Sequence, residues 1–306
     1  MKLLNIEDEK YPKLLKKIKN PPQKLYVKGN ENILNSTCIT VVGSRNMSEY
    51  GRKITKEIVK ELVLSGMCIV SGLAVGIDTI AHQTCLENNG KTIAVLGSGL
   101  NKIFPAENKN LFTSIINKGG AVISEYEPNT IAQKKFFPQR NRIVSGLSLG
   151  TLVIEATYRS GTSITAKCAF NQGRKVFCIP NSIGNKNSIG TINLLKNGAI
   201  LVTNAKEILY ELGIVNKKEN YEEIIEKEKK LKNYLLEQEE LSKLDEKAKI
   251  IYYYIKNNKI ANLEIMCNEL KMNVQEINVY LSILELKGLI INKYGTSYMV
   301  KDDLYA

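Results

Sequence analysis

The chain has 306 residues, of which 43% are hydrophobic, and it carries a formal net charge of +12. This length allows one large α/β domain with a smaller one, and the charge favours a polyanionic partner. The six cysteines form no Cys-x-x-Cys pair, and no apolar run is long enough to span a bilayer, which argues against a zinc site, a disulfide framework or a membrane protein. The N-terminus lacks the apolar region of a signal peptide, so we expect a cytoplasmic protein.

Residues 1–35 are too short for an independent domain. Tyr11–Leu15 predicts a short helix, and Lys24–Val27 predicts a strand that follows a rigid Pro-Pro turn. We therefore expect this segment to pack on the edge of the main domain.

Residues 38–78 predict a β-α-β unit. Ile39–Val42 is a continuous apolar run, typical of a strand buried on both faces, and Ser48 is a candidate cap for the next helix. Cys68–Val70 predicts the second strand, which ends at the turn Ser71-Gly72. Both strands thus end in turns at helix N-termini, where open α/β sheets bind anions.

Strand-like and helix-like segments continue to alternate after this unit. The further predicted strands are Lys91–Leu96, Ala121–Ser124, Thr151–Ile154, Lys175–Ile179 and Ala199–Val202. The pattern predicts an α/β fold, a Rossmann-like, doubly wound and mostly parallel sheet over residues 36–212.

Glycine and hydroxyl residues follow several strands and would meet at one rim of the sheet, where backbone N–H groups can approach a phosphate chain. They are Gly43, Ser44, Ser71, Gly72, Gly97, Ser98, Gly99, Ser160, Gly161, Thr162 and Ser163. Arg45 adds a cation, which either contacts a phosphate or pairs with an acidic neighbour such as Asp78. No G-x-G-x-x-G follows the first strand and no Walker lysine motif occurs, so no cofactor is expected.

A basic-aromatic segment follows the predicted strand at residues 121–124. Phe136 and Phe137 lie among cations, and stacking combined with phosphate contacts is typical of single-stranded nucleic acid binding. The neighbouring cations are Lys134, Lys135, Arg140 and Arg142. The alternative is that both rings anchor the core, which is the favoured interpretation for Phe136.

No catalytic constellation is evident. Glu155 follows a strand and could act as a general base, but no second carboxylate, nucleophile or metal cluster accompanies it. His82 is the only histidine and is interpreted as structural. We therefore expect neither an enzyme nor a metal site.

The C-terminal third predicts a different module. Residues 213–245 are rich in Lys and Glu and predict a charged helical linker, and residues 246–306 predict a winged-helix domain of three helices and a hairpin. The third helix offers Gln275 and Asn278 but also Glu276, so sequence-specific duplex reading is not favoured. Protein contact and auxiliary DNA contact remain open.

Taken together, these motifs closely resemble the DNA-processing protein A (DprA/Smf) family over about residues 11–212. The matching segments are Val42-Gly43-Ser44-Arg45, Ser71-Gly72-Leu73-Ala74, Gly76-Ile77-Asp78, Ala94-Val95-Leu96-Gly97, Phe137-Pro138, Arg140-Asn141-Arg142-Ile143 and Ser160-Gly161-Thr162-Ser163. The resemblance implies a non-enzymatic recombination mediator that binds and protects incoming single-stranded DNA, forms a homodimer and loads RecA in natural transformation.

The resemblance also assigns DNA-binding residues. They are Gly43, Ser44, Arg45, Ser71, Gly72, Lys134, Phe137, Arg140, Asn141, Arg142, Ser160, Gly161, Ser163 and Lys167. The chain departs from the family pattern at Pro180-Asn181 and at Asn193-Leu194, and we expect no room for the extra N-terminal helical domain of many members. Two alternatives are a Rossmann-fold nucleotide-processing hydrolase that uses Glu155 and a winged-helix transcription regulator. The hydrolase would need a P-G-G-x-G-T type of turn, which this sequence lacks.

Overall fold

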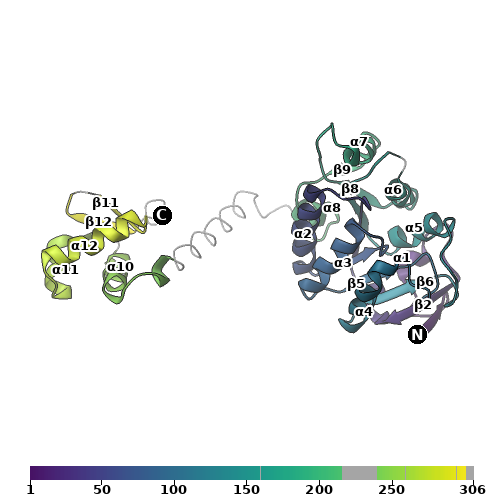
Figure 1. The fold of residues 1–306 in the computed structure, drawn as a ribbon, viewed down its shortest axis with the longest axis horizontal. Helices are drawn as coiled ribbons and strands as arrows, with labels where there is room; N and C mark the ends of the chain where they lie inside the picture. Colours follow the sequence, from purple (N-terminus) through teal and green to yellow (C-terminus); the bar gives the residue numbers. More distant parts are fainter. Residues whose placement is uncertain (159, 216–239, 259, 294, 301–306) are drawn as a thin grey trace. The chain divides into compact units, whose positions relative to one another are not determined.

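The structure is a computed structural model that describes residues 1–158, 160–215, 240–258, 260–293 and 295–300 (Figure 1). The chain divides into two compact units, residues 1–216 and 217–306. Most of the predicted linker, residues 216–239, lies outside the described residues. Within the described part of the chain, no helix is long and apolar enough to cross a membrane.

A nine-stranded sheet forms the centre of the first unit, in the order β1-β2-β6-β5-β4-β3-β7-β8-β9. The strands are β1 (Lys2–Asn5), β2 (Lys24–Gly29), β3 (Cys38–Val42), β4 (Cys68–Ser71), β5 (Thr92–Val95), β6 (Ala121–Ser124), β7 (Gly150–Val153), β8 (Lys175–Cys178) and β9 (Ile200–Leu201). All neighbours from β6 to β9 pair in parallel, which confirms the predicted doubly wound sheet.

The N-terminal segment does more than pack on the sheet edge, because it adds two antiparallel strands to it. β2 pairs with β6 in the register Tyr26↔Ser124, and β1 pairs with β2. This pairing satisfies the backbone of β6 and buries Leu4, Leu25 and Val27. β1 was not predicted from the sequence, since a four-residue strand with one buried position carries little periodic signal.

Helices cover both faces of the sheet, as Figure 1 shows for α2 and α3 on one side and α5 on the other. They are α1 (Lys13–Lys16), α2 (Glu49–Leu64), α3 (Ile77–Glu87), α4 (Lys109–Asn117), α5 (Phe136–Gly146), α6 (Gly161–Asn171), α7 (Ile189–Lys196) and α8 (Ala205–Glu211). Alternate residues of β3 enter different cores: Ile39 and Val41 pack with α2 and α3, whereas Cys38 and Val42 pack with α5 and α6. The continuous apolar run of β3 is explained by this burial on both faces.

The second unit has the element order of a winged helix. It contains α10 (Glu246–Asn258), β10 (Ala261–Asn262), α11 (Leu263–Leu270), α12 (Val274–Leu286), β11 (Ile290–Asn292) and β12 (Ser297–Val300), with the sheet order β10-β12-β11. Its own core includes Ile251, Met266, Leu281 and Leu284. The two-residue strand β10 was not expected, because its pairing with β12 is set by tertiary contact.

Candidate nucleic-acid interface

A groove of about 880 Å³ lies at the carboxyl ends of the strands. The parallel part of the sheet begins at β3, continues outward through β4, β5 and β6, and returns to β7 on the other side of β3. Open α/β sheets bind ligands where the strand order reverses in this way. The groove is lined by residues that follow β3 and β7, including Arg45 and Ser160, so it occupies this switch point.

Ten of the fourteen predicted site residues line the groove. They are Gly43, Ser44, Arg45, Gly72, Lys134, Phe137, Arg140, Asn141, Ser160 and Gly161. The structure does not bring the other four to it. Ser71 is buried and donates its hydroxyl to Val41 O, Ser163 interacts with the cap residue Ser160, and Lys167 lies further along α6.

The helical period of α5 explains why Arg142, which was predicted to bind DNA, does not line the groove. α5 starts at Phe136, so the basic-aromatic segment is helical from that residue on. Phe137, Arg140, Asn141 and Val144 follow the spacing i, i+3, i+4, i+7 and share the face that lines the groove. Arg142 lies off that face.

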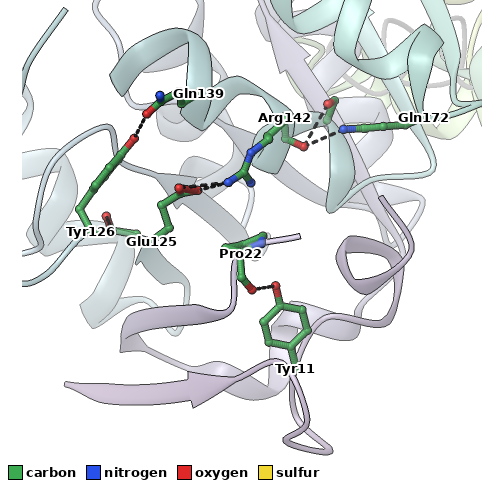
Figure 2. A network of polar contacts seen from close by, with 9 residues as sticks. Tyr11, Pro22, Glu125, Tyr126, Gln139, Arg142 and Gln172 are labelled. Carbon is green, nitrogen blue, oxygen red and sulfur yellow. Dashed lines mark hydrogen bonds and ion pairs between the residues drawn. The ribbon is translucent and has the colours of Figure 1, made fainter. Parts of the chain in front are cut away.

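Figure 2 shows that the Arg142 guanidinium instead points to Glu125, with 2.6 Å between Nη2 and Oε2. Burial raises the pKa of the Glu125 carboxyl, and Arg142 opposes this shift. Gln172, the residue that follows α6, donates to the Arg142 carbonyl at 2.9 Å, and the Tyr126 hydroxyl donates to Gln139 at 2.9 Å. These contacts hold α5 against α6 and the segment after β6, so Arg142 has a structural role in this arrangement.

The loop after β3 is held by contacts from three directions. Gly76, at φ +87°, approaches so closely that a Cβ there would lie 2.3 Å from Ser44 O. Ser44 donates its hydroxyl to Asn187 Oδ1 at 3.3 Å, and Asn187 Nδ2 donates to Asn46 O at 2.9 Å. The Thr162 hydroxyl of α6 donates to the carbonyl of Gly43 at 3.0 Å. The backbone that presents Arg45 is therefore fixed before any ligand binds.

Arg45 is exposed, and its guanidinium lies over the Phe137 ring, 5.9 Å from the ring centroid. No ion pair to Arg45 forms among the residues that the structure describes. The Asp78 carboxylate accepts instead from the backbone N–H groups of Gly72 and Ala74, at 3.0 and 3.4 Å. The cation thus remains available to a phosphate.

Phe136 does not enter the core, contrary to the interpretation favoured from the sequence. It is half-buried and stacks on Tyr126, with ring centroids 4.2 Å apart. Phe137 is also half-buried but faces the groove, where its centroid lies 5.4 Å from that of Phe104. The two neighbouring phenylalanines therefore serve different surfaces, because adjacent helical residues point about 100° apart.

Arg140 lines the groove but is only 5% exposed. Its Nη1 donates to the carbonyls of Gly72 and Val95, at the ends of β4 and β5. Burial lowers the pKa of Arg140 to about 10, and nearby Asp78 opposes that shift. A Cβ on Gly72 would lie 2.6 Å from Nη1, so a side chain at position 72 would displace the guanidinium. Arg140 joins the start of α5 to two strand ends.

The start of α6 adds backbone donors to the groove. Ser160 caps the helix by accepting from Ser163 N at 3.3 Å, and Asn141 Nδ2 donates to Gly161 O at 3.1 Å. The positive end of a helix macrodipole attracts anions. The groove lining contains four cationic side chains, Arg45, Lys134, Arg140 and Lys186, against the buried carboxylate of Asp78.

Glu155, the candidate general base, and His82 are both held in structural contacts. Glu155 is fully buried and accepts from the Ser48 backbone and hydroxyl and from the amides of Asn181 and Asn187. His82 is fully buried against Thr92, at 2.7 Å, and burial lowers its pKa to about 3. Among the described residues, no group of three or more His, Cys, Asp or Glu side chains is placed to hold a metal ion.

Sequence reasoning missed several groove residues, including Phe104, Lys186 and Asn187. Phe104 and Lys186 carried a weak signal, since an aromatic and a cation in loops after strands fit the same recipe. Asn187 carried none, because it reaches Ser44 across 143 residues of sequence.

The chain is similar to proteins of one known family. The family model for DNA recombination-mediator protein A matches residues 2–213. Protein Smf from Escherichia coli (strain K12) is 46% identical over 210 residues, which cover 69% of this chain and 56% of that protein. DNA processing protein DprA from Streptococcus pneumoniae is 44% identical over 207 residues, covering 68% of this chain and 73% of that one.

Two solved structures are similar to the first unit. The X-ray structure of DNA processing protein A from Streptococcus pneumoniae has a TM-score of 0.65 and 43% identity, covering 69% of this chain and 74% of that chain. A structure reporting the single-stranded DNA binding mode of DNA processing protein A from Helicobacter pylori has a TM-score of 0.62 and 29% identity, covering 69% and 96%.

The matched region spans little more than half the length of the relatives from Escherichia coli and Synechocystis. Residues 2–213, which the family model matches, include all of the nine-stranded sheet and every residue that lines the groove. On this match, the chain belongs to the DNA recombination-mediator protein A family, whose members are also named DprA or Smf.

Proposed function

We propose that this protein binds single-stranded DNA in the groove at the switch point and acts as a recombination mediator that protects the strand and loads RecA. The observation that carries the proposal is the placement of Arg45 and the start of α6 beside Phe137, a combination of phosphate donors and an aromatic surface. The Helicobacter pylori relative, whose structure reports a single-stranded DNA binding mode, supports the same ligand class.

The three exposed lining cations, Arg45, Lys134 and Lys186, and the backbone donors match a sugar-phosphate backbone, while the groove offers few groups that distinguish bases. We therefore expect binding that depends weakly on sequence and strongly on salt. Each neutralised phosphate should contribute about −0.7 to the slope of log affinity against log salt.

Fluorescence anisotropy with a labelled single strand and a duplex of equal length, across a salt series, tests the ligand class. We expect tighter binding to the single strand. Equal or tighter duplex binding would contradict the proposal. Loading is tested by RecA assembly on a strand already covered by single-strand-binding protein, where this protein should shorten the lag. An unchanged lag would refute loading alone.

We further propose that the protein forms a homodimer and catalyses no reaction itself. Light scattering after size exclusion gives the mass of the assembly in solution, and a monomer at micromolar concentration would refute the dimer. The contacts of Glu155 occupy both carboxylate oxygens, which disfavours a general base there. Product release from nucleotides or DNA that disappears in Glu155→Gln would instead support the hydrolase alternative.

The second unit gives no support to a sequence-reading regulator. Within α12 the exposed positions include Gln275, Asn278, Val279 and Leu286, and no Arg or Lys occurs between its first and last residue. Bidentate contacts to guanine need such cations. We propose that this unit contributes protein contacts or auxiliary DNA contacts.

A further inference from the structure

Phe104 is an aromatic side chain in the groove whose role the proposed DNA contacts do not explain. It lies in the loop after β5, lines the groove and is 48% exposed. Its ring is tilted by 43° against Phe137, with 5.4 Å between centroids. A phenylalanine left this exposed in a strongly cationic groove adds little to the core, so its surface is available to a ligand.

Phe137 has less free surface than its position suggests. A Cβ built on Gly97 would lie 2.9 Å from its ring, so the ring packs directly on that glycine. The Arg45 guanidinium lies over the same ring. A base that stacks on Phe137 must therefore share the ring with Arg45 or displace it, whereas Phe104 is more exposed.

We propose that Phe104 is a base-stacking residue, and that Phe104 and Phe137 together form an aromatic platform for successive bases. This inference rests on the proposed binding of single-stranded DNA. The 43° tilt prevents one flat base from stacking face-on against both rings, so we expect one base on each. Stacking on an aromatic ring tolerates any base, which agrees with a groove that offers few base-reading groups.

The test compares an oligothymidine with an abasic strand of the same length, which keeps the phosphates and lacks the bases. Phe104→Ala should weaken oligothymidine binding by about 5- to 150-fold. It should leave both abasic binding and the salt slope unchanged. Phe104→Leu, which keeps the apolar bulk without the ring, should lose nearly as much, and this separates stacking from support of Phe137. Leu64→Ala, an exposed apolar change at the end of α2, is the matched control.

A fluorescence reporter provides a second readout, because the chain contains no tryptophan. In Phe104→Trp the indole should be quenched by oligothymidine and not by the abasic strand. If the unmodified protein fails to bind oligothymidine, the proposed function fails. If the unmodified protein binds, three results overturn the inference about Phe104 while the function stands. The first is that Phe104→Ala binds oligothymidine as tightly as the unmodified protein, and the second is that it loses the same affinity for both strands. The third result is an indole that oligothymidine does not quench.

Discussion

Replacing Arg45 is the most direct test of the groove. Arg45 is exposed at the end of β3 and forms no ion pair among the described residues, so Arg45→Ala should remove a phosphate contact and little else. A charge-assisted hydrogen bond contributes about 1.5–3 kcal/mol, so affinity for single-stranded DNA should fall by about 10- to 150-fold. The salt slope should become shallower by about 0.7, the increment for one phosphate on a single strand.

The assay is fluorescence anisotropy across a salt series, with the melting temperature measured in parallel. Because the side chain is exposed, stability should change by less than about 0.5 kcal/mol. Arg52→Ala is a matched control, since Arg52 is an exposed arginine in the first turn of α2, outside the groove lining. An Arg45→Ala protein with an unchanged salt slope would refute the role of this cation.

The contact between Arg45 and Phe137 adds a consequence that single substitutions miss. A cation over a ring contributes about 0.5–1 kcal/mol at an exposed site. Binding that separates the two groups must break this contact, so Arg45→Ala and Phe137→Ala should be non-additive by a similar amount. A double-mutant cycle measures the coupling directly, and strict additivity would show that the two groups act independently in the complex.

Three further predictions follow from buried groups. Arg140→Gln removes the guanidinium that donates to the buried carbonyls of Gly72 and Val95, so it should destabilise the protein by about 1–3 kcal/mol for each acceptor left unpaired. The folded fraction should keep the wild-type salt slope, and a shallower slope would make Arg140 a phosphate ligand. Arg142→Ala breaks the pair with Glu125, so thermal unfolding should move to lower temperature with DNA affinity unchanged, and weakened binding by the folded protein would contradict this. His82 stays neutral in the folded state, with a pKa of about 3, and is protonated below about 6.5 when unfolded; lowering the pH from 7 to 5 should therefore cost about 2 kcal/mol of stability. Denaturant unfolding of His82→Gln should show no such loss between pH 7 and pH 5. The raised pKa of Asp78 affects both proteins alike, so it cancels in the comparison. If the stabilities of the two proteins depend equally on pH, the assignment to His82 is refuted.

Local patterns in the sequence were sufficient to predict most of the strands and helices of the first unit. The run at Ile39–Val42 and the cap at Ser48 appear in the structure as predicted, because burial on both faces and side-chain capping are encoded within a few residues. The glycine and hydroxyl turns also indicated the correct rim, since the carboxyl ends of parallel strands must meet on one side of a sheet.

Tertiary structure decided which side chains reach that rim. Arg140 and Arg142 are the same residue type in the same basic segment, and the sequence does not distinguish them. The start of α5 at Phe136 turns the first toward the groove and the second toward Glu125. Asn187 follows β8, and it joins the loop after β3 only because the sheet order places β7 and then β8 beside β3. Such contacts depend on helix phase and on pairing between distant segments, and neither is set by any short stretch of sequence.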